Sequence, residues 1–218
     1  MHTLVVFAHP EPDSLTGSTA RSIATGVTGT PGHTSEVADL TAEGFDPTFT
    51  TADLAVIRGT GRPPEDVRRE QSRIERAGRL VLVFPVYWWT MPALLKGWVD
   101  RVFTDGWAYG DGGDALVNRE VHLVALAGAS AGVYDRHGYT ESMRVAIDHG
   151  VFEYCNSRVT SSHVLHDVDQ VGTATLTAKI DALARVLNSY PGKRPGHPGR
   201  VTGPAVTESH DQVSSVTE

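Results

Sequence analysis

The sequence predicts an α/β protein built on a doubly wound, five-stranded parallel sheet. Short apolar runs rich in β-branched residues alternate along the chain with stretches of helical character. These runs are almost continuously apolar, as strands are when helices cover both faces of a sheet. Alternation of this kind makes consecutive strands parallel, and right-handed crossovers then place helices on both faces.

Two of the apolar runs are the clearest strands. Residues 4–8 read LVVFA and residues 80–84 read LVLVF, and both suit the buried middle of a parallel sheet. Weaker runs at residues 35–40, 121–126 and 159–165 complete the set. Five strands without a sixth favour the flavodoxin-like strand order over the longer dinucleotide-binding fold.

Helical stretches separate these strands. Ser14 is a suitable N-cap for the first helix. Segment 41–64 is rich in turn residues and ends in GRPP, so we expect it to be a loop, and we expect the same of the small-residue segment AGASAGVY after residue 126. The expected helices cover residues 14–27, 64–77, 93–103, 140–152 and 173–190.

Length and composition set the outer limits. The chain of 218 residues suffices for one α/β domain, which we assign to residues 1–190. Residues 191–218 hold no aromatic residue and many Pro, Gly, Ser and Thr, so we expect a disordered tail there. The net charge of −7 argues against a nucleic-acid partner and against an anionic membrane surface.

Cysteine usage and hydropathy point to the cytoplasm. The single cysteine, Cys155, excludes an internal disulfide and a multi-cysteine metal site, and we expect it to be a small core residue. A reducing cytoplasmic compartment fits that usage. The N-terminus lacks the basic region of a signal peptide, and no apolar run is long enough for membrane insertion.

The segment after the first strand is suited to binding a phosphate. A loop that enters a helix presents free backbone N–H groups and the positive end of the helix dipole. The hydroxyls of Ser14, Thr16 and Ser18 add donors. The alternative is an ordinary N-capped helix, which hydroxyls also favour. The segment carries neither a P-loop nor a G-x-G-x-x-G motif.

Three consecutive aromatic residues follow the strand at residues 80–84. The segment reads FPVYWWTMP, and Tyr87, Trp88 and Trp89 cannot all point into one core. A planar aromatic ligand flanked by Trp88 or Trp89 would explain them. An aromatic subunit interface is the alternative, and the two are compatible.

Small residues follow the strand at residues 121–126. The run from Gly128 to Gly132 lets the backbone approach a flat ligand closely. Tyr134 and His137 come next. Their phenol and imidazole groups could stabilise negative charge that develops on the ring of a flat ligand when it is reduced. The alternative is that both are ordinary surface residues.

Other polar residues are assigned structural roles. His163 and His166 point to opposite faces if they share a strand, so we expect no metal site there. Asp111 and Asp114 are expected in turns of the glycine-rich loop.

The stretch FPVYWWTMPALLKGWVDRVFTDGWAYGDGGDAL resembles the NAD(P)H:quinone oxidoreductases of the flavodoxin-like fold, the DT-diaphorase group. The resemblance is greatest to short bacterial members, such as the ancillary flavoproteins of Kef potassium-efflux systems and the drug-activity modulator type. VVFAHPEPDSLTGS matches the N-terminal strand and phosphate loop of that group. The resemblance covers roughly residues 3–140, and the combination of A-H-P, F-P-x-x-W and L-K-G-W-x-D-R-V-F carries it.

The resemblance implies a flavin site made of three segments. Its phosphate and ribityl loop matches His9, Ser14, Leu15 and Thr16, with Thr16 where Asn is usual. Its loop over the isoalloxazine ring matches Pro85, Val86, Tyr87, Trp88 and Trp89. Its T-T-G-G stretch matches Leu126, Ala127, Gly128 and Ala129, so hydrogen bonds there would come from backbone groups.

The resemblance also implies residues for catalysis and for a shared site. Tyr134 matches the catalytic tyrosine, whose histidine partner falls on Thr140, and His137 is the nearest histidine if the loop shifts. Tyr109 and Asp111 match positions that reach across a dimer interface. We therefore expect a homodimer in which Trp89, Trp107 and Tyr109 line the substrate site and the interface, because four large aromatic residues including Trp88 are too many for one monomer to expose.

The implied activity is a two-step transfer of hydride from NAD(P)H to the flavin and then to a quinone or similar acceptor. FMN is favoured over FAD, because the loop at residues 48–64 is shorter than in the FAD-binding animal members. Reduction of azo or nitro compounds is an alternative activity. A regulatory flavoprotein subunit of a cation antiporter is an alternative role.

Overall fold

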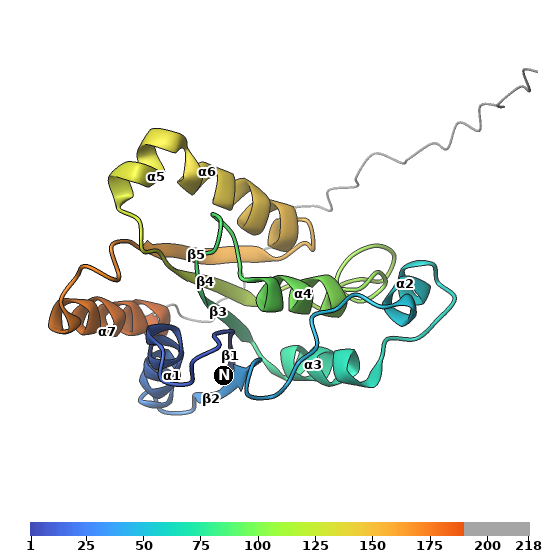
Figure 1. The fold of residues 1–218 in the computed structure, drawn as a ribbon. Helices are drawn as coiled ribbons and strands as arrows, with labels where there is room; N and C mark the ends of the chain where they lie inside the picture. Colours follow the sequence, from blue (N-terminus) through green and yellow to red (C-terminus); the bar gives the residue numbers. More distant parts are fainter. Residues whose placement is uncertain (190–218) are drawn as a thin grey trace, which may run out of the picture.

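A computed structural model describes residues 1–189 and confirms the predicted sheet. Its five strands are all parallel and follow the order β2-β1-β3-β4-β5, which is the flavodoxin-like order (Figure 1). The predicted tail at residues 191–218 lies outside the described residues. The strands are β1 (His2–Phe7), β2 (Thr34–Asp39), β3 (Arg79–Pro85), β4 (Glu120–Leu126) and β5 (Arg158–Leu165).

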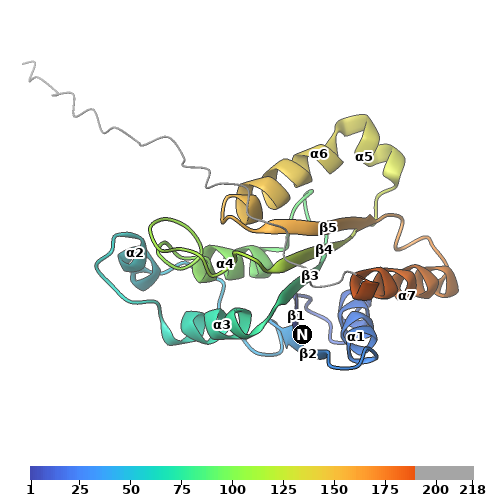
Figure 2. The ribbon, with the colours of Figure 1, turned by 180° about the vertical axis from the view of Figure 1, so that it is seen from behind.

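Helices cover both faces of the sheet (Figures 1 and 2). One face packs on α1 (Leu15–Thr28) and α7 (Thr173–Ser189), which lie side by side. The other face packs on α3 (Glu65–Arg76), α4 (Ala93–Val102) and the π-helix η1 (Arg144–Glu153). Because both faces are covered, β1, β3 and β4 are buried along almost their whole length.

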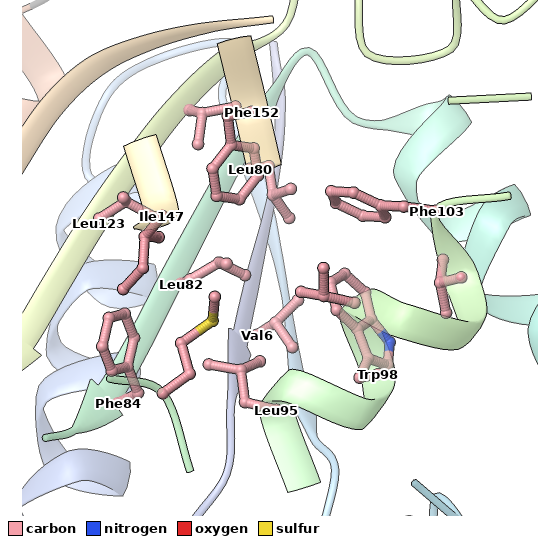
Figure 3. Packing of buried hydrophobic residues seen from close by; sticks show 14 of the residues in the cluster. Val6, Leu80, Leu82, Phe84, Leu95, Trp98, Phe103, Leu123, Ile147 and Phe152 are labelled. Atoms are coloured by element: carbon pink, nitrogen blue, oxygen red, sulfur yellow. The ribbon is translucent and has the colours of Figure 1, made fainter. Parts of the chain in front are cut away.

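Alternate side chains of each strand point to opposite faces of the sheet and pack in two separate cores. Val81 and Val83 of β3 pack with α1 and α7. Leu80 and Leu82 point the other way, into the larger core (Figure 3). Trp98 of α4 is the largest fully buried side chain of that core, and its indole Nε1 donates to Glu70 Oε2 at 3.1 Å. Cys155 is buried there too, as expected, and burial raises the pKa of its thiol to about 11.

The prediction of a continuous loop over residues 41–64 is wrong. Helix α2 (Thr51–Ile57) lies within it, capped by Thr50, whose hydroxyl accepts from the N–H of Asp53 at 3.3 Å. The Asp53 carboxylate pairs with Arg101 of α4 at 3.1 Å. A partner 48 residues away therefore holds a helix of only seven residues, which local periodicity does not reveal.

The region between β4 and β5 is also more helical than predicted. Helix α5 (Ala131–His137) occupies residues expected to form a loop, and Gly138 ends it with φ of 69°, a conformation that favours glycine. The predicted helix at 140–152 is instead α6 (Tyr139–Met143) followed by η1, in which the N–H of Tyr154 bonds to the carbonyl of His149 at 3.0 Å. Within residues 1–189, no helix combines the length and apolar character needed to cross a bilayer.

Candidate functional site

Three of the predicted site segments meet at one edge of the sheet. They follow β1, β3 and β4, which are hydrogen-bonded neighbours, so their carboxyl ends lie side by side. In doubly wound sheets ligands bind outside the carboxyl ends of the strands, where the strand order reverses direction. Here β1 and β3 flank that reversal.

The first segment brings the N-terminus of α1 to this edge. Ser14 is the N-cap, and its hydroxyl accepts from the N–H of Gly17 at 3.1 Å. Helix geometry leaves the N–H groups of Leu15 and Thr16 without intrahelical acceptors, so they point out of the helix end as donors. Ser18, also suggested as a donor, instead donates to the carbonyl of Ser14 at 2.9 Å. The ring Nδ1 of His9 accepts from the N–H of Glu11 at 3.0 Å, which fixes the loop before the helix.

The second segment is a tight turn made of bulky residues. Tyr87 and Thr90 exchange two backbone hydrogen bonds, each 3.1 Å long. The two residues between them, Trp88 and Trp89, have φ of 48° and 62°. Positive φ is strained for side chains of this size and persists only where the surroundings enforce it. Such strain is concentrated at ligand-binding sites, so this turn is a strong candidate for one.

The third segment is held by β5 and the residues after it. The N–H of Ala127 donates to the carbonyl of Leu165 at 2.8 Å, and Leu126 accepts from the N–H of Val86. These bonds link the second and third segments. Gly128 is exposed, and a Cβ there would lie 2.7 Å from an oxygen of Asp169.

An aromatic cluster closes one side of this edge. Trp89 stacks on Tyr139 with ring centroids 3.6 Å apart. Tyr134, only 1% exposed, meets Trp89 edge-on at 5.4 Å and His166 edge-on at 4.5 Å. Burial raises the pKa of the Tyr134 phenol, which therefore stays protonated and able to donate a hydrogen bond.

His166 rather than His137 contacts Tyr134. His137 ends α5 with an exposed side chain and stacks on Tyr139 at 5.3 Å. Thr140, the position that the family resemblance assigns to a histidine, is exposed and lines a cavity together with His166. Sequence reasoning considered His166 only as half of a metal pair with His163. Its place directly after β5, at the same edge as the other segments, was the signal that could have identified it.

The predicted interface aromatics are less exposed than expected. Trp107 donates from Nε1 to Glu75 at 2.8 Å and packs near Phe103. Tyr109 packs near Tyr154 with ring centroids 5.6 Å apart, and burial raises its phenol pKa. The premise that a monomer would have to expose all four large aromatic residues, Trp88, Trp89, Trp107 and Tyr109, is therefore wrong. Of the four, only Trp88 is exposed, with 91% of its surface in solvent.

The arrangement of a helix N-terminus, an aromatic turn and a small-residue loop at the carboxyl edge of this sheet agrees with a comparison against protein families. A family model described as a flavodoxin-like fold matches residues 1–189. The chain belongs to this family. A relative in Penicillium crustosum, a ribosyldihydronicotinamide dehydrogenase-like protein, is 33% identical over 184 residues, which cover 71% of this chain and 68% of the relative.

Solved structures of similar proteins agree with the family. An NAD(P)H:quinone oxidoreductase from Methanothermobacter marburgensis has a TM-score of 0.76 and 26% identity, covering 86% of this chain and 96% of that one. General stress protein 14 from Treponema denticola, solved in complex with FMN, has a TM-score of 0.61 and 27% identity, covering 85% and 95% of the two chains.

Proposed function

We propose that the chain is a flavin-dependent NAD(P)H oxidoreductase that reduces quinones or similar aromatic acceptors. The observation that carries the proposal is the meeting, at one sheet edge, of a donor-rich helix N-terminus, a strained aromatic turn and a small-residue loop with an exposed glycine, Gly128. These are the three parts that a phosphate, a flat ring and the polar rim of that ring require. The named activities of the relatives from Penicillium and Methanothermobacter support the same reading.

The residues present fit a flavin. The N–H groups of Leu15 and Thr16, with the loop from His9 to Ser14, would hold its phosphate and ribityl chain. Residues 85–89 would lie along the ring. The stretch Leu126–Ala129 would meet its pyrimidine side through backbone groups. When bound, the flavin supplies the chemistry of accepting a hydride from NAD(P)H and passing it to the acceptor.

The protein itself supplies orientation and protons. Trp89, Tyr134 and Tyr139 form a packed wall at the sheet edge, which excludes water from one side of the site. Tyr134 is a neutral hydrogen-bond donor within that wall, suited to an oxygen that gains negative charge during reduction.

FMN is the flavin we favour. Helix α2 and the residues around it are fixed to α4 by the Asp53–Arg101 pair, so the short segment after β2 is committed to packing on the body of the protein. The FMN bound to the Treponema relative supports the same choice. The two hydride donors, NADH and NADPH, are both compatible with the site residues.

In this proposal the protein is a homodimer, and it works in the cytoplasm. Trp88 is the residue that most favours a dimer. Its indole lies almost wholly in solvent at the tip of a strained turn, which is unfavourable unless a second protein surface covers it. Tyr87 beside it is 46% exposed and Tyr154 is 66% exposed. A twofold axis would let one chain cover the turn of the other.

The dimer is tested by sedimentation of the flavin-loaded protein. We expect a dimer at micromolar concentration, and Trp88→Ala should weaken association at least about tenfold, or roughly 1.4 kcal/mol. Ile57→Ala, which removes an exposed apolar side chain from α2, is the matched control and should leave association unchanged. A wild-type monomer with full turnover would contradict the shared site.

The activity is tested with menadione as acceptor. Purified protein loaded with FMN should oxidise NADH or NADPH in proportion to the menadione supplied, with one quinone reduced for each nicotinamide oxidised. Protein without flavin should neither oxidise the nicotinamide nor reduce menadione. Flavin-loaded protein that oxidises neither donor in the presence of menadione would disprove the proposed function.

A further inference from the structure

The aromatic turn after β3 has a backbone conformation that its own residues disfavour. Trp88 and Trp89 lie between the hydrogen-bonded residues Tyr87 and Thr90, and both have positive φ. Tight turns with two such residues are normally built from Asn and Gly, because larger side chains are strained in that conformation. A contact outside the turn must therefore hold it in this shape.

The side chain of Trp89, rather than that of Trp88, makes contacts that hold the turn. Trp88 is almost wholly exposed, whereas Trp89 is half-buried and packs against the larger core. The Trp89 indole stacks on Tyr139 with ring centroids 3.6 Å apart and ring planes within 11° of parallel. It meets Tyr134 only edge-on, with centroids 5.4 Å apart. Stacking at this distance brings two ring faces into contact, so Tyr139 restrains the indole more than Tyr134 does.

The fold fixes Tyr139 on its own side. Tyr139 is the first residue of α6 and directly follows Gly138, the left-handed residue that ends α5. Its ring lies beside His137 with centroids 5.3 Å apart, and edge-on to Tyr134 with centroids 6.0 Å apart. A helix start and two neighbouring rings therefore hold the Tyr139 ring, which presents a preformed surface to Trp89.

The backbone of the turn is where this contact matters for a ligand. The two hydrogen bonds of the turn use the N–H groups of Tyr87 and Thr90, so those of Trp88 and Trp89 are not part of this pairing. The φ and ψ angles of the two tryptophans determine which way these N–H groups and the indole rings face. In the proposed function residues 85–89 lie along the flavin ring, so a change in the turn would displace the groups that meet the ring.

We propose that Tyr139 is a positioning residue for the flavin ring. The inference rests on the proposed function. Tyr139 stacks on the Trp89 indole, holds the turn in its left-handed conformation, and so keeps it in the shape that accepts a flat ring. The ring of Tyr139 rather than its hydroxyl has this role, because stacking uses the ring face. Without that ring the indole is released, and the turn relaxes towards the negative φ that tryptophan favours.

The test measures the binding of two ligands to flavin-free protein. FMN carries the ring, the ribityl chain and the phosphate, whereas riboflavin lacks only the phosphate. Tyr139→Leu removes the aromatic ring but keeps an apolar side chain that suits a helix. We expect it to weaken both ligands by the same factor, about fivefold or more, because the contact is lost at the ring. Weaker binding of FMN with unchanged binding of riboflavin would place the defect at the phosphate and overturn the proposal.

Tyr139→Phe keeps the stacked ring and is the second variant. It should bind both ligands within about twofold of the wild type, because only the hydroxyl is lost. Equal losses in Tyr139→Phe and Tyr139→Leu would show that the hydroxyl is what matters, and would overturn the proposal. Phe49→Leu is the matched control, since it removes an exposed aromatic ring from the segment before α2. It should bind both ligands as the wild type does.

A double-mutant cycle shows whether Tyr139 acts through Trp89. Trp89→Leu removes the other ring of the stack. In that background Tyr139→Leu should change FMN affinity by less than about twofold, because no indole is left for it to position. A loss as large as in the wild-type background would mean that Tyr139 acts on the flavin directly or through the fold in general, and would overturn the positioning role.

The wild-type protein separates this inference from the proposed function. Wild-type protein that takes up neither FMN nor riboflavin contradicts the flavin site, and the role of Tyr139 with it. Wild-type protein that binds both ligands, with Tyr139→Leu binding them equally well, leaves the proposed function intact and overturns the role of Tyr139.

Discussion

Gly97 lies in α4 at a point where no side chain fits. A Cβ built on it would lie 2.5 Å from the carbonyl oxygen of Pro47 and closer still to the Pro47 ring. The L-K-G-W pattern that carried the family resemblance therefore has a packing reason. The segment after β2 crosses α4 with its backbone in direct contact with the helix.

Gly97→Ala tests this contact. Alanine normally stabilises a helix relative to glycine, but here we expect a loss of about 1–3 kcal/mol in the free energy of unfolding, because Pro47 must move. Gly172→Ala is the control, since a Cβ there meets nothing within 4 Å. Denaturant titration measures the free energy of unfolding of both variants. Equal stability of the two would show that Pro47 moves aside at no measurable cost.

Single site residues were predictable only where their chemistry shows in the local sequence. Ser14 is a good N-cap by residue type, and Trp88 and Trp89 attract notice as consecutive aromatics. The left-handed backbone of that turn could not be predicted, because nothing in two tryptophans favours it. The contact of His166 with Tyr134 joins residues far apart in the chain and depends on how α5 packs beside β5.

At the scale of elements, Arg101 determines how three helices fit together. Its guanidinium bonds to Asp53 of α2 at 3.1 Å, to Asp66 of α3 at 2.6 Å and to the carbonyl oxygen of Asp46 at 2.7 Å. Arg101 and Asp53 are both about 4% exposed. The hydrogen bonds and the nearby carboxylates raise the pKa of the guanidinium in spite of its burial.

Arg101→Leu should destabilise the protein by about 3 kcal/mol, because it leaves the Asp53 carboxylate buried without its partner. Adding Asp53→Asn should recover part of the loss. Arg68→Leu, which removes an exposed ion pair with Glu65, is the control and should cost about 1 kcal/mol or less. A loss from Arg101→Leu no larger than the control loss would show that α2 is held in place by other contacts.

The elements that were mispredicted share one physical feature. Helix α2 depends on Arg101, and α5 ends at a left-handed glycine only one residue before α6 begins. Both helices have only seven residues, which is too short for a helical pattern of apolar residues to be recognised in the sequence. Helices this short form in proteins through tertiary packing. The long apolar strands, by contrast, were placed correctly because their burial on two faces appears directly in the sequence.

At the scale of the whole molecule, strand order determines where the site lies. Alternating strands and helices predicted a parallel sheet, and five strands predicted the order in which β1 and β3 are neighbours at the centre. From that order alone, the segments after β1, β3 and β4 had to meet at one edge. The arrangement of the site was therefore predictable before any of its contacts, whereas the pairing of particular side chains was not.

The central claim is that this edge binds a flavin, and the most direct measurement is an FMN titration of flavin-free protein followed by visible absorbance and tryptophan fluorescence. The account predicts binding with a Kd of about 1 µM or tighter, roughly −8 kcal/mol, with quenching of tryptophan fluorescence as FMN occupies the edge beside Trp88 and Trp89. Protein that stays colourless and takes up neither FMN nor FAD would contradict it.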